Sequence, residues 1–78
     1  MTVTDKVQLT ESQERVLFGV HEGLTHGQIA ARLGIAERTV KAYIELLRKK
    51  FGDARGEPVK TGRELIPIAH EYFRAQGL

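Results

Sequence analysis

The chain of 78 residues contains no cysteine and only two prolines. Without cysteine it can form no disulfide and no thiolate metal site, and it offers no thiol nucleophile, as expected in a reducing compartment. It has no apolar run long enough to span a membrane, and its first residues, MTVTDKVQ, lack the apolar segment of a signal peptide. These absences favour one small intracellular domain with a modest core, whose stability is marginal or shared with a partner subunit.

Patterns for catalysis or metal binding are missing as well. His21, His26 and His70 lie on separate predicted elements without metal-ligand spacing, and His70-Glu71 lacks the second histidine of an HExxH motif. Ser12 is the only serine, and no nucleophile constellation surrounds it. The segment GDARG lacks the Lys-Ser/Thr of a phosphate-binding loop. We therefore expect no enzymatic activity, no bound metal and no cofactor.

The charge is small overall but unevenly distributed. Of the net +2, residues 36–63 contribute +4, from eight Lys/Arg against four acidic residues. Residues 1–35 and residues 64–78 each contribute −1. Such a concentration is typical of a polyanion-binding face, although a solvated helix surface with salt bridges has the same pattern.

Hydrophobic periodicity predicts helices throughout. Residues 1–8 show no pattern, which predicts a flexible tail, and residues 9–78 form the single domain. Thr10 and Gln13 have the spacing of a capping box, so a first helix starts there and ends near Gly23.

The stretch 25–52 contains two helical patterns joined by a tight turn, the layout of a helix-turn-helix. Thr25 and Gln28 repeat the capping-box spacing and start the first of these helices, which stops at Gly34. The next helix begins near Ala36 or Glu37 and ends at Gly52. Ala36 stands where Ser or Thr would cap the helix better, by about 1 kcal/mol.

Residues 53–61 contain turn-forming residues and predict a loop, and a last helix is predicted over residues 62–76. Pro67 predicts either a kink in that helix or a regular part that starts near the proline. Ile66 and Phe73 form a second apolar stripe, which favours a surface for dimerisation. The alternative is that both side chains fold onto the small core.

The segments LTESQERVL, EGLTHGQIAARLGI and TVKAYIELLRKKFG cover roughly residues 9–52 without a gap, and together they resemble the LuxR/NarL/GerE type of DNA-binding domain. The resemblance implies an all-α, four-helix fold whose third helix enters the DNA major groove and whose last helix often pairs two subunits. It implies a sequence-specific regulator of transcription that binds double-stranded DNA. The protein would be cytoplasmic and nucleoid-associated, from a bacterium or a phage.

Most members of this family carry a receiver or ligand-binding module. We expect a free-standing (GerE-like) member, because 78 residues leave no room for such a module. The chain departs from the family at Tyr43, where histidine is usual, at His26 and Gly27, and in a longer link after Arg55. The longer link changes the connection to the predicted dimerisation helix.

On the third predicted helix, the family pattern places base contacts at Lys41, Ala42 and Glu45. Lys41 would donate to guanine, Ala42 would touch a thymine methyl group, and Glu45 would accept from cytosine. Glu45 is equally explained as a surface ion pair with Lys41 or Lys49. The expected DNA-backbone contacts are Thr25, Gln28, Arg38, Thr39, Arg48 and Lys49, with Lys50 as a further candidate. Thr25 and Gln28 can equally be helix caps alone, and Tyr43 is more often a core residue than a contact.

Two other functions fit the same residues. A small helix-turn-helix can act as an adaptor that binds RNA polymerase or another transcription factor without productive DNA contact. Region 4 of sigma factors has a similar pattern. Salt dependence separates the cases, because DNA binding weakens steeply as salt rises whereas an adaptor shows little such binding.

Overall fold

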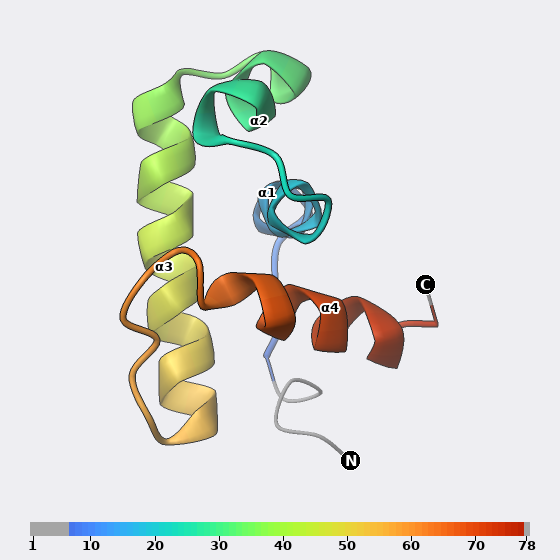
Figure 1. Cartoon of the computed structure of the whole chain (residues 1–78), viewed down its shortest axis with the longest axis vertical. Coiled ribbons are helices and arrows are strands. Elements are labelled where there is room, and N and C mark those ends of the chain that lie inside the picture. The colour runs from blue at the N-terminus through green and yellow to red at the C-terminus, as the bar shows by residue number, and fades with distance from the viewer. Residues whose placement is uncertain (1–6, 78) are drawn as a thin grey trace.

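The computed structural model describes residues 7–77 and contains four helices, α1 (Glu11–His21), α2 (His26–Leu33), α3 (Glu37–Arg55) and α4 (Leu65–Ala75). No strand occurs within these residues, so the predicted all-α, four-helix fold is confirmed. Figure 1 shows α3 as a long rod at one edge of the molecule, with the other three helices on one side of it. None of the described helices is long and apolar enough to cross a bilayer.

The core lies around α1, which packs against each of the other helices. Val16 and Leu17 of α1 have no exposed surface, and neither have Val40, Leu47 and Phe51 of α3. Burial of these apolar side chains holds α3 against the body of the domain.

The N-termini of α1 and α2 form as predicted. The Thr10 hydroxyl accepts from the Gln13 N–H at 3.2 Å, and the Gln13 amide oxygen accepts from the Thr10 N–H at 3.1 Å. Thr25 and Gln28 make the same reciprocal pair, at 3.2 and 2.8 Å. Two capping boxes therefore fix where α1 and α2 begin.

The turn between α2 and α3 depends on Gly34. Its φ of 68° lies in the left-handed region, where a side chain is unfavourable, and its N–H donates to the carbonyl of Ala30. Ala36 precedes α3 without a side-chain cap, as expected.

A second glycine, Gly19, sets the spacing between α1 and α2. A Cβ atom built on Gly19 would lie 2.6 Å from Cγ1 of Ile29. Ile29 is 1% exposed, so almost all of its side chain is in contact with the rest of the domain. The two helices thus approach more closely than a side chain at position 19 would allow without a shift of Ile29.

The predicted end of α3 at Gly52 is wrong. The helix continues to Arg55 and ends at Gly56, whose φ is 75°. Gly52 is buried inside the helix, and a Cβ there would lie 3.4 Å from the Glu57 carbonyl oxygen and from the Val59 nitrogen. It is glycine because the following loop folds back across it, and the helix does not stop there.

The predicted start of α4 at residue 62 is also wrong. Glu64 and Thr61 make the expected reciprocal hydrogen bonds, but these close a tight turn, and the regular helix starts at Leu65. Pro67 is then the third residue of α4, where the missing N–H has no helical partner to lose. Of the two alternatives for Pro67, the start near the proline is correct.

Two further expectations differ from the structure. Residues 1–6 of the predicted tail lie outside the described residues, but Val7 is 9% exposed and belongs to the core. Phe73 is 2% exposed, and its ring meets that of Phe18 edge-on at 5.2 Å between centroids. It packs onto α1 and is not part of an exposed second stripe, while Ile66 is half-buried.

Candidate nucleic-acid interface

The outer side of α3 carries most of the predicted contact residues. Arg38, Lys41, Ala42, Glu45 and Lys49 are exposed, whereas Thr39 and Arg48 are half-buried. The opposite side of the helix is buried in the core, so these side chains point away from the domain. In Figure 1 this side of α3 forms one edge of the molecule.

The predicted base-contact strip of Lys41, Ala42 and Glu45 is exposed along its length. Glu45 pairs with neither Lys41 nor Lys49, because the ion pairs within residues 7–77 lie elsewhere: Arg15–Glu11, Arg32–Glu22 and Arg55–Glu57. The polar ends of the strip are therefore available to a ligand.

Leu46 belongs beside this strip and was missed by the sequence reasoning. It is 38% exposed, and it lies four residues after Ala42, hence on the same side of α3. Its spacing from Ala42 was a usable signal. An exposed leucine next to an alanine adds an apolar contact surface to a polar face.

Thr25 and Gln28 are exposed at the start of α2, and the Thr25 hydroxyl and the Gln28 amide oxygen accept the hydrogen bonds of the capping box. Their role as caps is thus present in the structure. The N–H groups of His26 and Gly27, between them, have no helical partner because they belong to the first turn. Such N–H groups favour a nearby anion.

Arg48 does not extend from the surface. Its Nε donates to the carbonyl oxygen of Val59 at 3.0 Å, and a terminal guanidinium nitrogen donates to that of Lys60. In this structure Arg48 therefore holds the loop that follows α3. Sequence reasoning missed this role because the partners lie eleven and twelve residues away.

Lys50 is engaged in a similar way. Its Nζ donates to the Gln13 amide oxygen at 2.8 Å and to the Gln8 carbonyl oxygen at 3.1 Å. It ties α3 to the segment that leads into α1. The bond from Lys50 also gives the amide oxygen of Gln13 a hydrogen-bond donor, and Gln13 is only 7% exposed.

An open hollow adjoins the strip on α3. It is bounded by the start of α2, the first half of α3 and the loop before α4, and its charged lining residues are Glu37, Lys41 and Arg63, with His26 beside them. Arg63 is exposed and was not among the predicted contacts.

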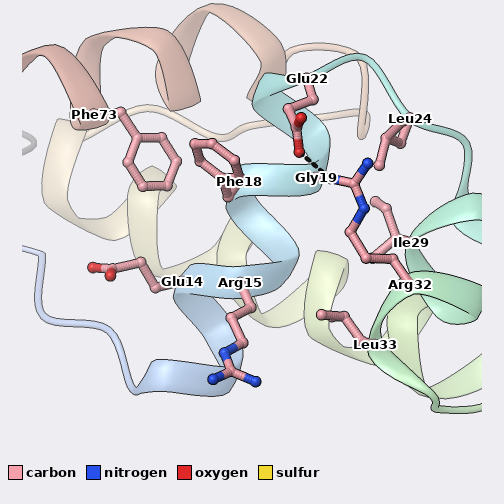
Figure 2. Close-up of a pocket in the computed structure, with 10 residues that line it drawn as sticks. All are labelled: Glu14, Arg15, Phe18, Gly19, Glu22, Leu24, Ile29, Arg32, Leu33 and Phe73. Atoms are coloured by element: carbon pink, nitrogen blue, oxygen red, sulfur yellow. Dashed lines mark hydrogen bonds and ion pairs between the residues drawn. The ribbon is translucent and has the colours of Figure 1, made fainter. Parts of the chain in front are cut away.

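A second, mainly apolar hollow lies between α1 and α2 and is shown in Figure 2. Gly19, Leu24 and Ile29 are among the residues that line it, and Phe18, 39% exposed, stands at its edge. Glu22 and Arg32 form an ion pair at the rim.

The histidines do not form a metal centre among the described residues. The structure brings the rings of His21 and His70 to 4.3 Å between centroids, a proximity that their sequence spacing does not reveal. No group of three or more His, Cys, Asp or Glu residues within residues 7–77 can hold a metal ion.

Residues 7–55 match the family described as bacterial regulatory proteins, luxR family. Over 44 residues the chain is 52% identical to the DNA-binding transcriptional activator DevR/DosR of Mycobacterium tuberculosis, a match that covers 55% of this chain and 20% of the relative. It is 43% identical over 44 residues to the transcriptional activator proteins AhyR of Aeromonas hydrophila and AsaR of Aeromonas salmonicida, covering 56% of this chain and 17% of each relative.

The chain thus spans a fifth or less of the length of the curated relatives that it matches. No solved structure matches it. The family match begins at Val7, which belongs to the core, and ends at Arg55, the last residue of α3. The loop after α3 and α4 itself lie outside the match.

Proposed function

The chain belongs to the luxR family of bacterial regulatory proteins, and on that premise we propose that it binds double-stranded DNA sequence-specifically and regulates transcription. The observation that carries the proposal is the burial of α3 on one side only. Val40 and Leu47 are fully buried on one side, while Lys41, Ala42 and Glu45 are exposed on the other. A helix held in this way can enter the major groove, which is wide enough for it.

Base recognition would come from the exposed strip on α3. Lys41 can donate to the acceptor atoms of guanine, and Glu45 can accept from the amino group of cytosine. Ala42 and Leu46 can contact thymine methyl groups or sugars. In DNA a glutamate is repelled by phosphates, so Glu45 is useful only where a base donor compensates it.

Contacts to the DNA backbone would flank the strip. Lys49, Arg38 and Thr39 lie on α3, and the exposed start of α2 carries Thr25 and Gln28. Such contacts fix orientation and affinity without reading the sequence. Arg48 contributes indirectly, since its guanidinium is occupied by the loop.

Two features extend the proposal to the protein's context. The relatives DevR/DosR and AhyR are transcriptional activators, so activation is the first mode to test. We also propose a homodimer through the exposed side of α4, with Ile66 at its edge. Phe73 is not part of this surface, because it is buried in the monomer.

The test is a selection of bound sequences from a pool of random duplexes, followed by binding measurements at several salt concentrations. The proposal predicts an enriched motif, and an affinity that falls steeply with salt because each neutralised phosphate releases counterions. If no motif is enriched and the chain shows no salt-dependent binding to any duplex, the proposal is wrong.

A protein-binding adaptor is the second candidate, favoured by one observation. Phe18 is 39% exposed beside the apolar hollow of Figure 2, and such a surface suits a contact with RNA polymerase or another transcription factor. An adaptor would bind such a protein with unchanged affinity after Lys41→Ala, and would bind duplex DNA weakly at every salt concentration.

A further inference from the structure

The loop between α3 and α4, residues 56–64, packs against the domain, although it lies outside the family match. Val59 is 6% exposed and belongs to the core. Gly52 lets the backbone at Glu57 and Val59 pass closely over α3. The loop is therefore packed onto the helix that carries the base-contact strip.

Two charged side chains fix the backbone of the loop on either side of Lys60. Arg48 donates from α3 to the carbonyl oxygens of Val59 and Lys60. The carboxylate of Glu64 accepts from the N–H groups of Lys60 and Thr61. The planar guanidinium is suited to this two-point contact, whereas a lysine ammonium would be a single point charge. These bonds fix the path of the chain immediately before Arg63.

Arg63, at the end of this loop, faces the same open hollow as Lys41 of α3. Both line the open hollow that the first residues of α2 close on the other side. Neither takes part in an ion pair within residues 7–77. Glu37 is the one acid that lines the same hollow, so the two cations outnumber it.

We propose that Arg63 is a further DNA-backbone contact, which binds a phosphate of the strand bordering the groove that α3 enters. Arg48 is a positioning residue that acts through the loop. The inference rests on the proposed function, and it adds a contact that the loop of this chain supplies. The guanidinium of Arg63 suits a DNA phosphate, because its N–H donors can bind two phosphate oxygens at once.

The first test compares Arg63→Ala with the parent on a mixed-sequence duplex of about 20 base pairs, two helical turns. The slope of log affinity against log salt should become shallower by about 1, with affinity about five- to tenfold lower at about 0.1 M salt. Arg74→Ala is the matched control, because Arg74 is also exposed but lies near the end of α4, away from α3. It removes the same charge and should leave the slope unchanged.

The second test separates positioning from direct contact. Arg48→Lys keeps the charge but loses the two-point contact, so it should weaken binding if Arg48 works by placing Arg63. In the Arg63→Ala background it should then have no further effect. Circular dichroism on each variant confirms that the helices remain. Additive losses in the double variant would show that Arg48 does not act through Arg63.

The outcomes distinguish this inference from the function on which it rests. A parent that shows no salt-dependent binding to the duplex overturns the proposed function itself. A parent that binds with a steep salt slope, while Arg63→Ala keeps that slope or Arg74→Ala lowers it equally, overturns only the assignment of Arg63.

Discussion

The hydroxyl of Tyr72 on α4 donates a 2.8 Å hydrogen bond to Oε2 of Glu14 on α1. Tyr72 is 4% exposed, and its ring packs edge-on against Phe51 of α3. Three helices thus meet at one phenol. Burial of the hydroxyl, and then the hydrogen bond and negative charge of Glu14, raise the pKa of Tyr72 from 10.0 to about 12.

This raised pKa predicts a loss of stability at alkaline pH. Between the unfolded pKa of 10.0 and the folded pKa of about 12, the unfolded chain loses the Tyr72 proton while the folded chain keeps it. The free energy of unfolding should therefore fall as pH rises through that window, by about 1–2 kcal/mol. Denaturant unfolding of the Tyr43→Phe variant, in which Tyr72 is the only tyrosine, measures the effect. Adding Tyr72→Phe should abolish it, and an equally steep alkaline loss without any tyrosine would contradict the assignment.

Lys41 and Lys49 should differ in what their loss does to DNA binding. Lys41→Ala should weaken binding to the selected sequence by about 1–3 kcal/mol and relax the preference at one base pair. Lys49→Ala should lower affinity for all sequences alike and flatten the salt slope. Competition between selected and scrambled duplexes measures both. A Lys41→Ala variant that retains the parent's base preferences would remove Lys41 from the reading strip.

Gly34→Ala should destabilise the domain by about 1 kcal/mol. The positive φ of 68° is the cause, because a Cβ at this position would meet no atom within 4 Å. Gly27→Ala is the matched control inside α2, the helix that Gly34 ends, and the atom nearest to its Cβ, a carboxylate oxygen of Glu37, is 3.7 Å away. It should be neutral or stabilise by up to about 1 kcal/mol. Thermal unfolding of the two variants should shift in different directions or by clearly different amounts.

Ala36→Ser should stabilise the start of α3. Ala36 has the extended backbone of an N-cap, with φ −71° and ψ 147°, but no side chain to accept from the first turn. A serine hydroxyl supplies that acceptor and should add about 1 kcal/mol, which raises Tm by roughly 4–8 °C in a domain of this size. Ala36→Val, which adds bulk without an acceptor, should give no such gain.

Ile66 and Phe73, the two residues predicted to lie at a dimer surface, should respond differently to substitution. Ile66→Asp should give a folded monomer if α4 pairs two subunits, because Ile66 is only half-buried. Phe73→Asp should unfold the domain, since it places a charge at a site that is 2% exposed. Analytical ultracentrifugation and circular dichroism on both variants separate the cases. A parent that is monomeric at high concentration would contradict the dimer.

Local rules predicted the parts of the fold that depend on neighbours in the sequence. The reciprocal bonds of Thr10 with Gln13 and the left-handed turn at Gly34 each involve residues within a few positions. The apolar side of α3 was predicted for the same reason, because helical periodicity alone places Val40 and Leu47 together.

The features that sequence reasoning missed depend on residues far apart in the chain. Gly52 looked like a helix end, but its neighbour is a loop that returns across it. Arg48 and Lys50 were predicted as phosphate contacts from their charge, and their hydrogen bonds within the domain were missed because the partners lie eleven or more positions away. Phe73 looked like part of a second face until α1 was placed against α4.

The contact between Gly19 and Ile29 has a consequence for how the domain can vary. A Cβ at position 19 would lie 2.6 Å from Cγ1 of Ile29, so the Ile29 side chain would have to shift, and we expect the packing of α2 against α1 to change with it. A single added methyl group, remote from every proposed contact, should therefore tilt the start of α2 relative to α3. Altered recognition can arise at this hidden position without any change in the residues that touch the ligand.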